Sequence, residues 1–175
     1  MENKIAVFVA TWCYSGLIPP VILTGMAGTY GSFFSIPLCC LALLLARQGW
    51  WPLYCVILIL VLLLGFWSVP KAEAALGPKT DWRGKIKIHD QNQIVIDETF
   101  GMLVTCCPLA MVGFNSYLLV LGSAFALFRF FDIVKIPPAT FFDKMKNAWG
   151  VMFDDFVAGI YAAIVLLLLV LTLGL

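Results

Sequence analysis

The chain has 175 residues, of which 62% are hydrophobic and 12% are charged, and its formal net charge is +1. Soluble domains are typically about 45–50% apolar and about one quarter charged, so this composition excludes an ordinary soluble domain and indicates a membrane protein. The length corresponds to a single domain over residues 1–175, and no nucleic-acid partner is expected.

Five apolar stretches approach the roughly 17–25 residues that a membrane-spanning helix needs. In chain order they are residues 32–47, 51–69, 98–113, 116–131 and 155–175. The third and fourth are short for two full crossings. Residues 5–23 are also apolar, but Gly16, Pro19 and Pro20 favour a helix that enters and stops, or one that lies at the interface. The predicted fold is therefore all-α: a polytopic membrane helical bundle with four to five transmembrane helices plus interfacial, amphipathic helices.

The polar segments predict which helix ends share one side of the membrane. Tight turns are expected at 47–49 and 113–116, whereas 70–96 and 132–154 are longer, charged and amphipathic. If each tight turn joins two spans, both long segments lie on one side. The basic residues on that side are Lys71, Lys79, Arg83, Lys85, Lys87, Arg129, Lys135, Lys144 and Lys146, while Arg47 lies opposite. Because positive residues favour the cytoplasmic side, the long segments are expected to face the cytoplasm.

Acidic residues gather on the same predicted side. Three segments that are distant in sequence carry them near span ends: Asp97, Glu98, Asp132, Asp154 and Asp155. Asp97 and Asp154 could instead be helix N-caps, and Asp132 could form a surface ion pair with Lys135. Capping explains one acid per helix but not an Asp-Glu or an Asp-Asp doublet. Since ionisable groups at membrane depth are costly unless paired or coordinated, the acidic residues predict a functional cluster.

Carboxylates that lie close together repel one another unless a cation lies among them. Mg²⁺ takes oxygen ligands, commonly carboxylates with water and substrate phosphate, so we expect the five acidic residues to hold Mg²⁺ and to supply a catalytic base. Arg129 and Lys135 lie three residues before and after Asp132, on roughly one helix face, and are predicted to bind phosphate oxygens. The sequence leaves open which carboxylate is the base and how many ions bind.

The segment from Gly28 to Ser32 is predicted to be a short loop before a helix. Two glycines, Gly28 and Gly31, can expose backbone N–H groups that bind an anion at the helix N-terminus, and the Thr29 and Ser32 hydroxyls can add hydrogen bonds. An ordinary capped turn is the alternative interpretation. We assign the segment as a supporting part of the substrate-binding site.

Other phosphatase mechanisms lack their residues in this sequence. The single histidine, His89, excludes a histidine nucleophile paired with a second histidine, and no Cys is followed at six positions by Arg. No Asp-x-Asp-x-Thr is present for an aspartyl-phosphate mechanism. The six cysteines form no CxxC pair, and we interpret them as packing residues. Metal-assisted attack by water, with a carboxylate as general base, is the mechanism that remains.

Taken together, four segments resemble bacterial phosphatidylglycerophosphatase A. They are Gly28–Ser32, Ile96–Gly101, Arg129–Lys135 and Gly150–Tyr161, and their order and spacing extend the resemblance over nearly the whole chain. The chain departs from the usual family pattern at Ala27, at Ile136 and at Ala148-Trp149, beside the acidic residues rather than at them.

The resemblance implies a Mg²⁺-dependent phosphatase that converts phosphatidylglycerophosphate to phosphatidylglycerol and inorganic phosphate. It also implies a location in the bacterial cytoplasmic (inner) membrane with the active site at the cytoplasmic face. Two alternatives are a related lipid phosphatase with another headgroup, such as phosphatidic acid, and an ion-coupled membrane transporter. A transporter would usually place its carboxylates near the midplane. The amphipathic run 138–149 is predicted to be an interfacial helix, or one that packs on the bundle.

Overall fold

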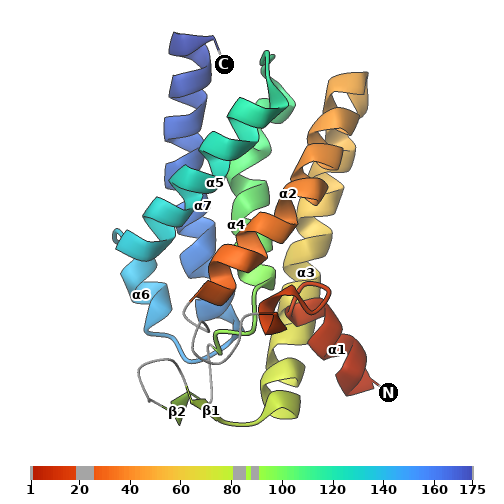
Figure 1. The fold of residues 1–175 in the computed structure, drawn as a ribbon, viewed down its shortest axis with the longest axis vertical. Helices are drawn as coiled ribbons and strands as arrows, with labels where there is room; N and C mark the ends of the chain where they lie inside the picture. The colour runs from red at the N-terminus through yellow and green to blue at the C-terminus, as the bar shows by residue number, and fades with distance from the viewer. Residues whose placement is uncertain (1, 19–25, 81–85, 88–90, 175) are drawn as a thin grey trace.

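The computed structural model describes residues 2–18, 26–80, 86–87 and 91–174, and it is a helical bundle (Figure 1). The longer helices are α2 (Ala27–Leu45), α3 (Trp51–Leu76), α4 (Ile96–Cys106), α5 (Tyr117–Val134) and α7 (Ala148–Leu173). The shorter helical segments are α1 (Glu2–Ala10), η1 (Ser15–Leu17), η3 (Ala46–Trp50), η4 (Cys107–Ala110) and α6 (Ala139–Asp143). Strands β1 (Lys79–Thr80) and β2 (Ile86–Lys87) pair antiparallel. The predicted all-α class is confirmed.

Three of the described helical stretches are long and apolar enough to cross a membrane: Ala27–Leu76, Tyr117–Val134 and Ala148–Leu173. The first comprises α2 and α3, which η3 joins at Gly49, where a φ of 92° interrupts the helix. The predicted number of four to five transmembrane helices is not confirmed. Large apolar side chains such as Leu63, Leu118 and Leu171 are more than half exposed on these helices, as expected for surfaces that contact lipid.

The tight turns lie at one end of the bundle and the long polar segments at the other, as predicted (Figure 1). Arg47 donates a hydrogen bond to the Phe114 carbonyl at 3.0 Å, which joins the two turns. Asn115 donates to the Gly174 carbonyl at 2.7 Å, so the C-terminus lies at the same end. Among the residues named in the sequence analysis, Pro19, Pro20, Arg83, Lys85 and His89 lie outside the described part of the chain.

Helix α4, which overlaps the predicted span at 98–113, lies at the core of the bundle. It packs against α2, α3, α5 and α7, and all of its residues except Glu98 are buried. Its 11 residues rise only about 16 Å at about 1.5 Å each, roughly half of the hydrocarbon thickness. A helix buried in protein and a helix buried in lipid have the same hydrophobic composition, so the apolar run alone does not distinguish them, and the predicted span is not confirmed.

Two further segments differ from their predictions. The Gly28–Ser32 segment is not a loop, because α2 already begins at Ala27. The amphipathic run 138–149 is not one interfacial helix, because α6 covers only Ala139–Asp143 and α7 begins at Ala148. In the first of these segments, glycine lets the chain just before α4 pack closely against α2. A Cβ atom on Gly31 would lie 2.4 Å from the Val95 side chain.

Candidate active site

The acidic doublets do not cap their helices. The N-cap of α4 is Val95, which makes no side-chain capping bond, and Asp97 lies in the first turn. The N-cap of α7 is Asn147, whose side chain accepts a hydrogen bond from the Gly150 amide at 3.0 Å, and Asp154 lies well inside the helix. The capping alternative is therefore wrong for Asp97 and Asp154.

Helices α4 and α7 bring the two doublets together through a close backbone contact. A Cβ atom on Gly159 of α7 would lie 2.7 Å from the carbonyl oxygen of Gly101 on α4, so the helices approach this closely only because the residue is glycine. Thr105 donates a 2.9 Å hydrogen bond to the same Gly101 carbonyl and lies 3.4 Å from the Gly159 carbonyl. The contact lies one to two turns from the acidic residues and fixes their separation.

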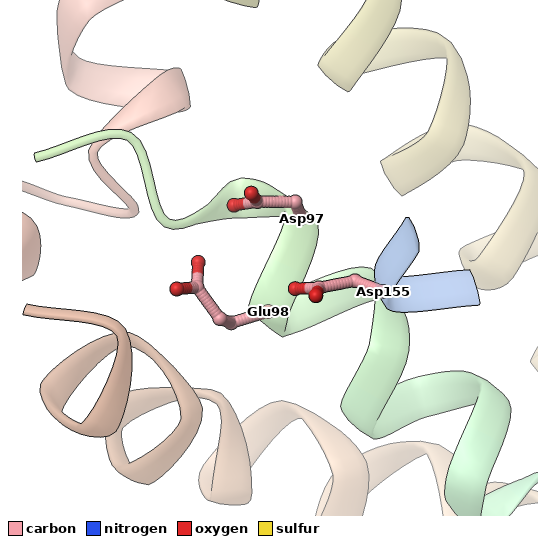
Figure 2. Close-up of side chains that lie close together, drawn as sticks. All are labelled: Asp97, Glu98 and Asp155. Atoms are coloured by element: carbon pink, nitrogen blue, oxygen red, sulfur yellow. The ribbon is translucent and has the colours of Figure 1, made fainter. Parts of the chain in front are cut away.

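Asp97, Glu98 and Asp155 form a cluster in which the carboxylates point into a common space (Figure 2). One oxygen from each lies within 4.8 Å of the others. Asp97 and Asp155 are buried, and the Glu98 side chain is 13% exposed. Each of the three has one buried oxygen without a hydrogen-bond partner: Asp97 Oδ1, Glu98 Oε2 and Asp155 Oδ2.

Three buried carboxylates with unpartnered oxygens are a costly arrangement for a folded protein. A buried polar group is normally hydrogen-bonded, and a buried charge is normally paired or bound to a metal. Oxygen ligands at this separation are the donors that a hard divalent cation takes. The residues therefore fit Mg²⁺, with Asp97, Glu98 and Asp155 as its ligands.

Asp132 lies at the edge of this cluster and is paired with Arg129. The Arg129 Nη1 atom is 2.6 Å from Asp132 Oδ2 and 3.9 Å from Glu98 Oε1. Asp132 is also close enough to Glu98 and Asp155 to interact with both electrostatically. The Arg129 Nε atom is buried without a partner, so this guanidinium has a donor available beside the carboxylates. An unpaired donor of this kind suits a phosphate oxygen.

Asp154 points to a different partner than Asp155 does. Its Oδ2 atom lies 2.7 Å from the Lys135 Nζ atom, and Lys135 also pairs with Asp143 of α6. Burial alone would lower the pKa of Lys135, but the neighbouring Asp154 and Asp143 carboxylates outweigh it and raise the pKa above the ordinary value of 10.5. Lys135 therefore remains charged and holds α6 against α7 beside the site.

The predicted anion loop contributes to the site as the first turns of a helix. The Ser32 hydroxyl donates to the Gly28 carbonyl at 2.8 Å and lies 3.5 Å from Arg129 Nη1. A Cβ atom on Gly28 would lie 2.2 Å from Glu98 Oε1 and 2.9 Å from Arg129 Nη1. Gly28 therefore leaves the space that Glu98 and Arg129 occupy.

The structure thus brings together most of the predicted site residues, in three groups with different partners. Asp97, Glu98 and Asp155 form the metal-compatible cluster, Arg129 and Asp132 form a pair beside it, and Lys135 and Asp154 form a second pair. Thr29 lines a cavity between α2 and α5, and it is the neighbour in sequence of Gly28, which packs against Glu98 and Arg129. Asp143 is a further residue beside the site, and its sequence position gave no sign of this, since only the chain reversal after α5 brings it back to Lys135.

Comparison with known proteins gives a consistent result. A family profile described as Phosphatidylglycerophosphatase A matches residues 8–170. The chain is 36% identical over 152 residues to "Phosphatidylglycerophosphatase A" of Haemophilus influenzae, covering 86% of this chain and 80% of the relative. It is 31% identical over 150 residues to the Escherichia coli protein of the same name, covering 85% and 74%.

A third relative has a different printed name. The chain is 34% identical over 112 residues to a "Putative phosphatidylinositol-3-phosphatase" of Bacteroides thetaiotaomicron, covering 63% of this chain and 61% of that protein. No solved structure matches the chain.

Proposed function

The chain belongs to the phosphatidylglycerophosphatase A family, and on this premise we propose that it is a Mg²⁺-dependent phosphatase that hydrolyses phosphatidylglycerophosphate to phosphatidylglycerol and inorganic phosphate. The observation that carries the proposal is the buried cluster of Asp97, Glu98 and Asp155 with an unpartnered oxygen on each. These oxygens fit a divalent cation, and Arg129 beside them offers a free donor to an anion.

The residues of the chain divide the work of phosphate hydrolysis. Mg²⁺, when bound by Asp97, Glu98 and Asp155, supplies positive charge that polarises the phosphate and acidifies water. Arg129 binds phosphate oxygens through its guanidinium, which Asp132 holds at 2.6 Å. A carboxylate of the site accepts a proton from the water whose oxygen bonds to phosphorus. The P–O ester bond breaks, and the lipid oxygen leaves as a hydroxyl after it takes up the proton that the protonated carboxylate returns.

The two ion pairs have different roles in this mechanism. Asp132 orients Arg129, so the guanidinium meets the phosphate in a fixed position rather than as a flexible chain. Lys135 is already bound by Asp154 and Asp143, so its first contribution is to fix α6 and α7 beside the site. Contact between Lys135 and a phosphate oxygen stays a prediction, and it requires the ion pair with Asp143 at the exposed edge to open.

We place the site at the cytoplasmic face of the bacterial inner membrane. The acidic cluster comes from the start of α4 and an early turn of α7, at the end of the bundle that carries the long polar segments (Figure 1). The Lys and Arg bias of those segments favours the cytoplasmic side. A carboxylate cluster at one end also argues against an ion-coupled transporter, which would need its acidic groups near the midplane.

Phosphate release from defined lipids is the experiment that tests this function. The purified protein, with Mg²⁺ or with EDTA, is given phosphatidylglycerophosphate, phosphatidic acid, lysophosphatidic acid or phosphatidylinositol 3-phosphate. We expect release from phosphatidylglycerophosphate that EDTA abolishes and Mg²⁺ restores. Preferred release from phosphatidylinositol 3-phosphate would favour the activity named for the Bacteroides thetaiotaomicron relative. No release from any of these lipids would refute the proposal.

A further inference from the structure

Two adjoining apolar cavities lie between α2 and α5, share two lining residues and together form a groove. One part, with a volume of about 240 Å³, is lined by Met26, Thr29, Tyr30, Phe33 and Phe125. A second part, with a volume of about 510 Å³, shares Phe33 and Phe125 and continues along Ile36, Leu118, Leu121 and Gly122. The rings of Phe33 and Phe125 meet edge to face where the two parts join, with centroids 6.5 Å apart. We call this feature the α2–α5 groove.

One end of the α2–α5 groove lies beside the candidate active site. Thr29 and Tyr30 line that end, and they belong to the same turns of α2 as Gly28 and Ser32. Gly28 packs against Glu98 and Arg129, and the Ser32 hydroxyl lies 3.5 Å from Arg129. A molecule whose phosphate contacts Arg129 can therefore continue directly into the groove, past the two hydroxyl-bearing side chains.

The groove has the apolar character of a surface that contacts the hydrocarbon core of a membrane, and along α2 it covers about half of that core. From Met26 to Ile36 the α2 backbone rises about 15 Å, at about 1.5 Å per residue, which is half of the roughly 30 Å hydrocarbon core. Beyond Thr29 and Tyr30 the lining is almost entirely hydrocarbon, and Phe33 and Leu118 are 59% and 83% exposed. Both helices belong to stretches that are apolar enough to span a membrane, so the groove opens toward lipid.

From this geometry we propose that the α2–α5 groove binds one acyl chain of the phosphatidylglycerophosphate molecule whose headgroup occupies the active site. The proposal rests on the proposed function and adds the position of the lipid tail. The groove aligns the lipid so that its phosphate arrives beside Arg129, and binding of the tail stabilises the complex with the headgroup. Substrates with short chains lose this contribution because they leave the Leu118 and Gly122 end unfilled.

Gly122 allows the groove to be filled without disturbing the fold. A Cβ atom at this position would meet nothing within 4 Å, so Gly122→Leu places its side chain in open space. Ala126→Leu is the matched control, because Ala126 is exposed on the same helix and is absent from the groove lining. Thermal unfolding of both variants checks that each is folded.

The test compares kcat/KM for dioleoyl and dihexanoyl phosphatidylglycerophosphate in mixed detergent micelles. We expect Gly122→Leu to lower the dioleoyl-to-dihexanoyl ratio about tenfold. That factor corresponds to about 1.4 kcal/mol, what roughly two buried methylene groups contribute at about 0.8 kcal/mol each. Ala126→Leu is expected to keep the wild-type ratio. An unchanged ratio in folded Gly122→Leu would overturn the groove proposal while leaving the phosphatase activity established.

A second measurement distinguishes a substrate chain from bulk membrane lipid. Phosphatidylglycerophosphate carrying a photoreactive diazirine on one acyl chain is cross-linked to the wild-type protein, and the labelled peptides are identified. We expect labels on α2 and α5 around Phe33 and Leu118, displaced by unlabelled phosphatidylglycerophosphate but not by phosphatidylcholine. Equal displacement by both lipids would show that the groove holds annular lipid only and would overturn the proposal. Absence of turnover for every chain length would refute the proposed function instead.

Discussion

Replacing Gly28 by alanine tests the site geometry with the smallest available change. The added Cβ atom would lie 2.2 Å from Glu98 Oε1 and 2.9 Å from Arg129 Nη1, both at the far ends of long side chains. A carbon and an oxygen in ordinary contact need about 3.4 Å, so the Glu98 carboxylate has to retreat by about 1.2 Å. The backbone of α2 can stay in place, because the clash is with movable side-chain ends.

The cost of this displacement falls on catalysis rather than on folding. A misplacement of about 1 Å at a catalytic group can cost about 10²-fold in rate, which is about 2.7 kcal/mol of transition-state stabilisation. We expect Gly28→Ala to lower kcat for phosphatidylglycerophosphate about 100-fold and to raise the Mg²⁺ concentration needed for half-maximal activity. The melting temperature should change little, since alanine is also the better helix former at this position.

Phosphate release and thermal unfolding of the same purified sample provide the assay. Gly113→Ala is the matched control, because a Cβ atom there meets nothing within 4 Å and the residue belongs to the tight turn whose Phe114 carbonyl accepts a hydrogen bond from Arg47, away from the site. If Gly28→Ala retains full activity at the wild-type Mg²⁺ requirement, then Glu98 and Arg129 do not need the positions that the structure gives them. That result would refute the assignment of Glu98 and Arg129 to the catalytic site.

Three further changes test other parts of the site. Asp97→Asn or Asp155→Asn should lower kcat at least 100-fold while the protein still inserts and folds, and near-normal turnover in both would remove the metal-cluster account. Gly159→Ala pushes α4 from α7 and should cost about 1–3 kcal/mol of stability, seen as a melting temperature lowered by several degrees. Lys135→Met should cost about 1–3 kcal/mol through its lost ion pairs. Those pairs raise the pKa of Lys135 above 10.5, so this stabilisation is complete below pH 10.5 and is lost only as the pH rises through the folded-state pKa. The difference in melting temperature between Lys135→Met and the wild type should therefore stay constant from pH 6 to pH 9.

The features that follow from local sequence were predictable. Apolar length identified the helical stretches, and the turns at Arg47 and Asn115 were evident from polar residues between apolar runs. The separation of polar long segments from tight turns then followed from counting crossings. The acidic doublets were also visible, because consecutive carboxylates such as Asp97-Glu98 in an apolar setting have no ordinary packing explanation.

The features that depend on tertiary contacts were not predictable. The first turns of α2 look like a flexible glycine loop in sequence, yet Gly28 and Gly31 are there to admit Glu98, Arg129 and Val95. At both positions another part of the chain packs closely against the glycine, and the neighbouring sequence does not indicate which residues those are. A glycine at a helix crossing and a glycine in a loop are indistinguishable until the neighbouring element is placed.

The pairing of the acidic residues could not be predicted for a similar reason. Five carboxylates on one side predicted one shared set of metal ligands. In the structure, Asp132 forms an ion pair with Arg129 and Asp154 forms one with Lys135. In the helix, Asp154 and Asp155 point about 100° apart, so a doublet naturally serves two partners rather than one. The helix period was available from the sequence, whereas the position of Lys135 relative to α7 depends on the turn after α5.

The charge balance of the site gives a physical reason to propose a cation for substrate binding as well as for chemistry. Among the residues that the structure describes, Asp154 is offset by Lys135, which leaves Asp97, Glu98, Asp132 and Asp155 facing the guanidinium of Arg129. If all of these groups are ionised, three negative charges remain uncompensated in a buried setting, and a phosphate monoester would add about two more. Without a cation the phosphate would be repelled before it reached Arg129. A divalent cation held by Asp97, Glu98 and Asp155 would reduce this excess from three negative charges to one, so we expect removal of the metal to weaken binding of the substrate as well as to stop its hydrolysis.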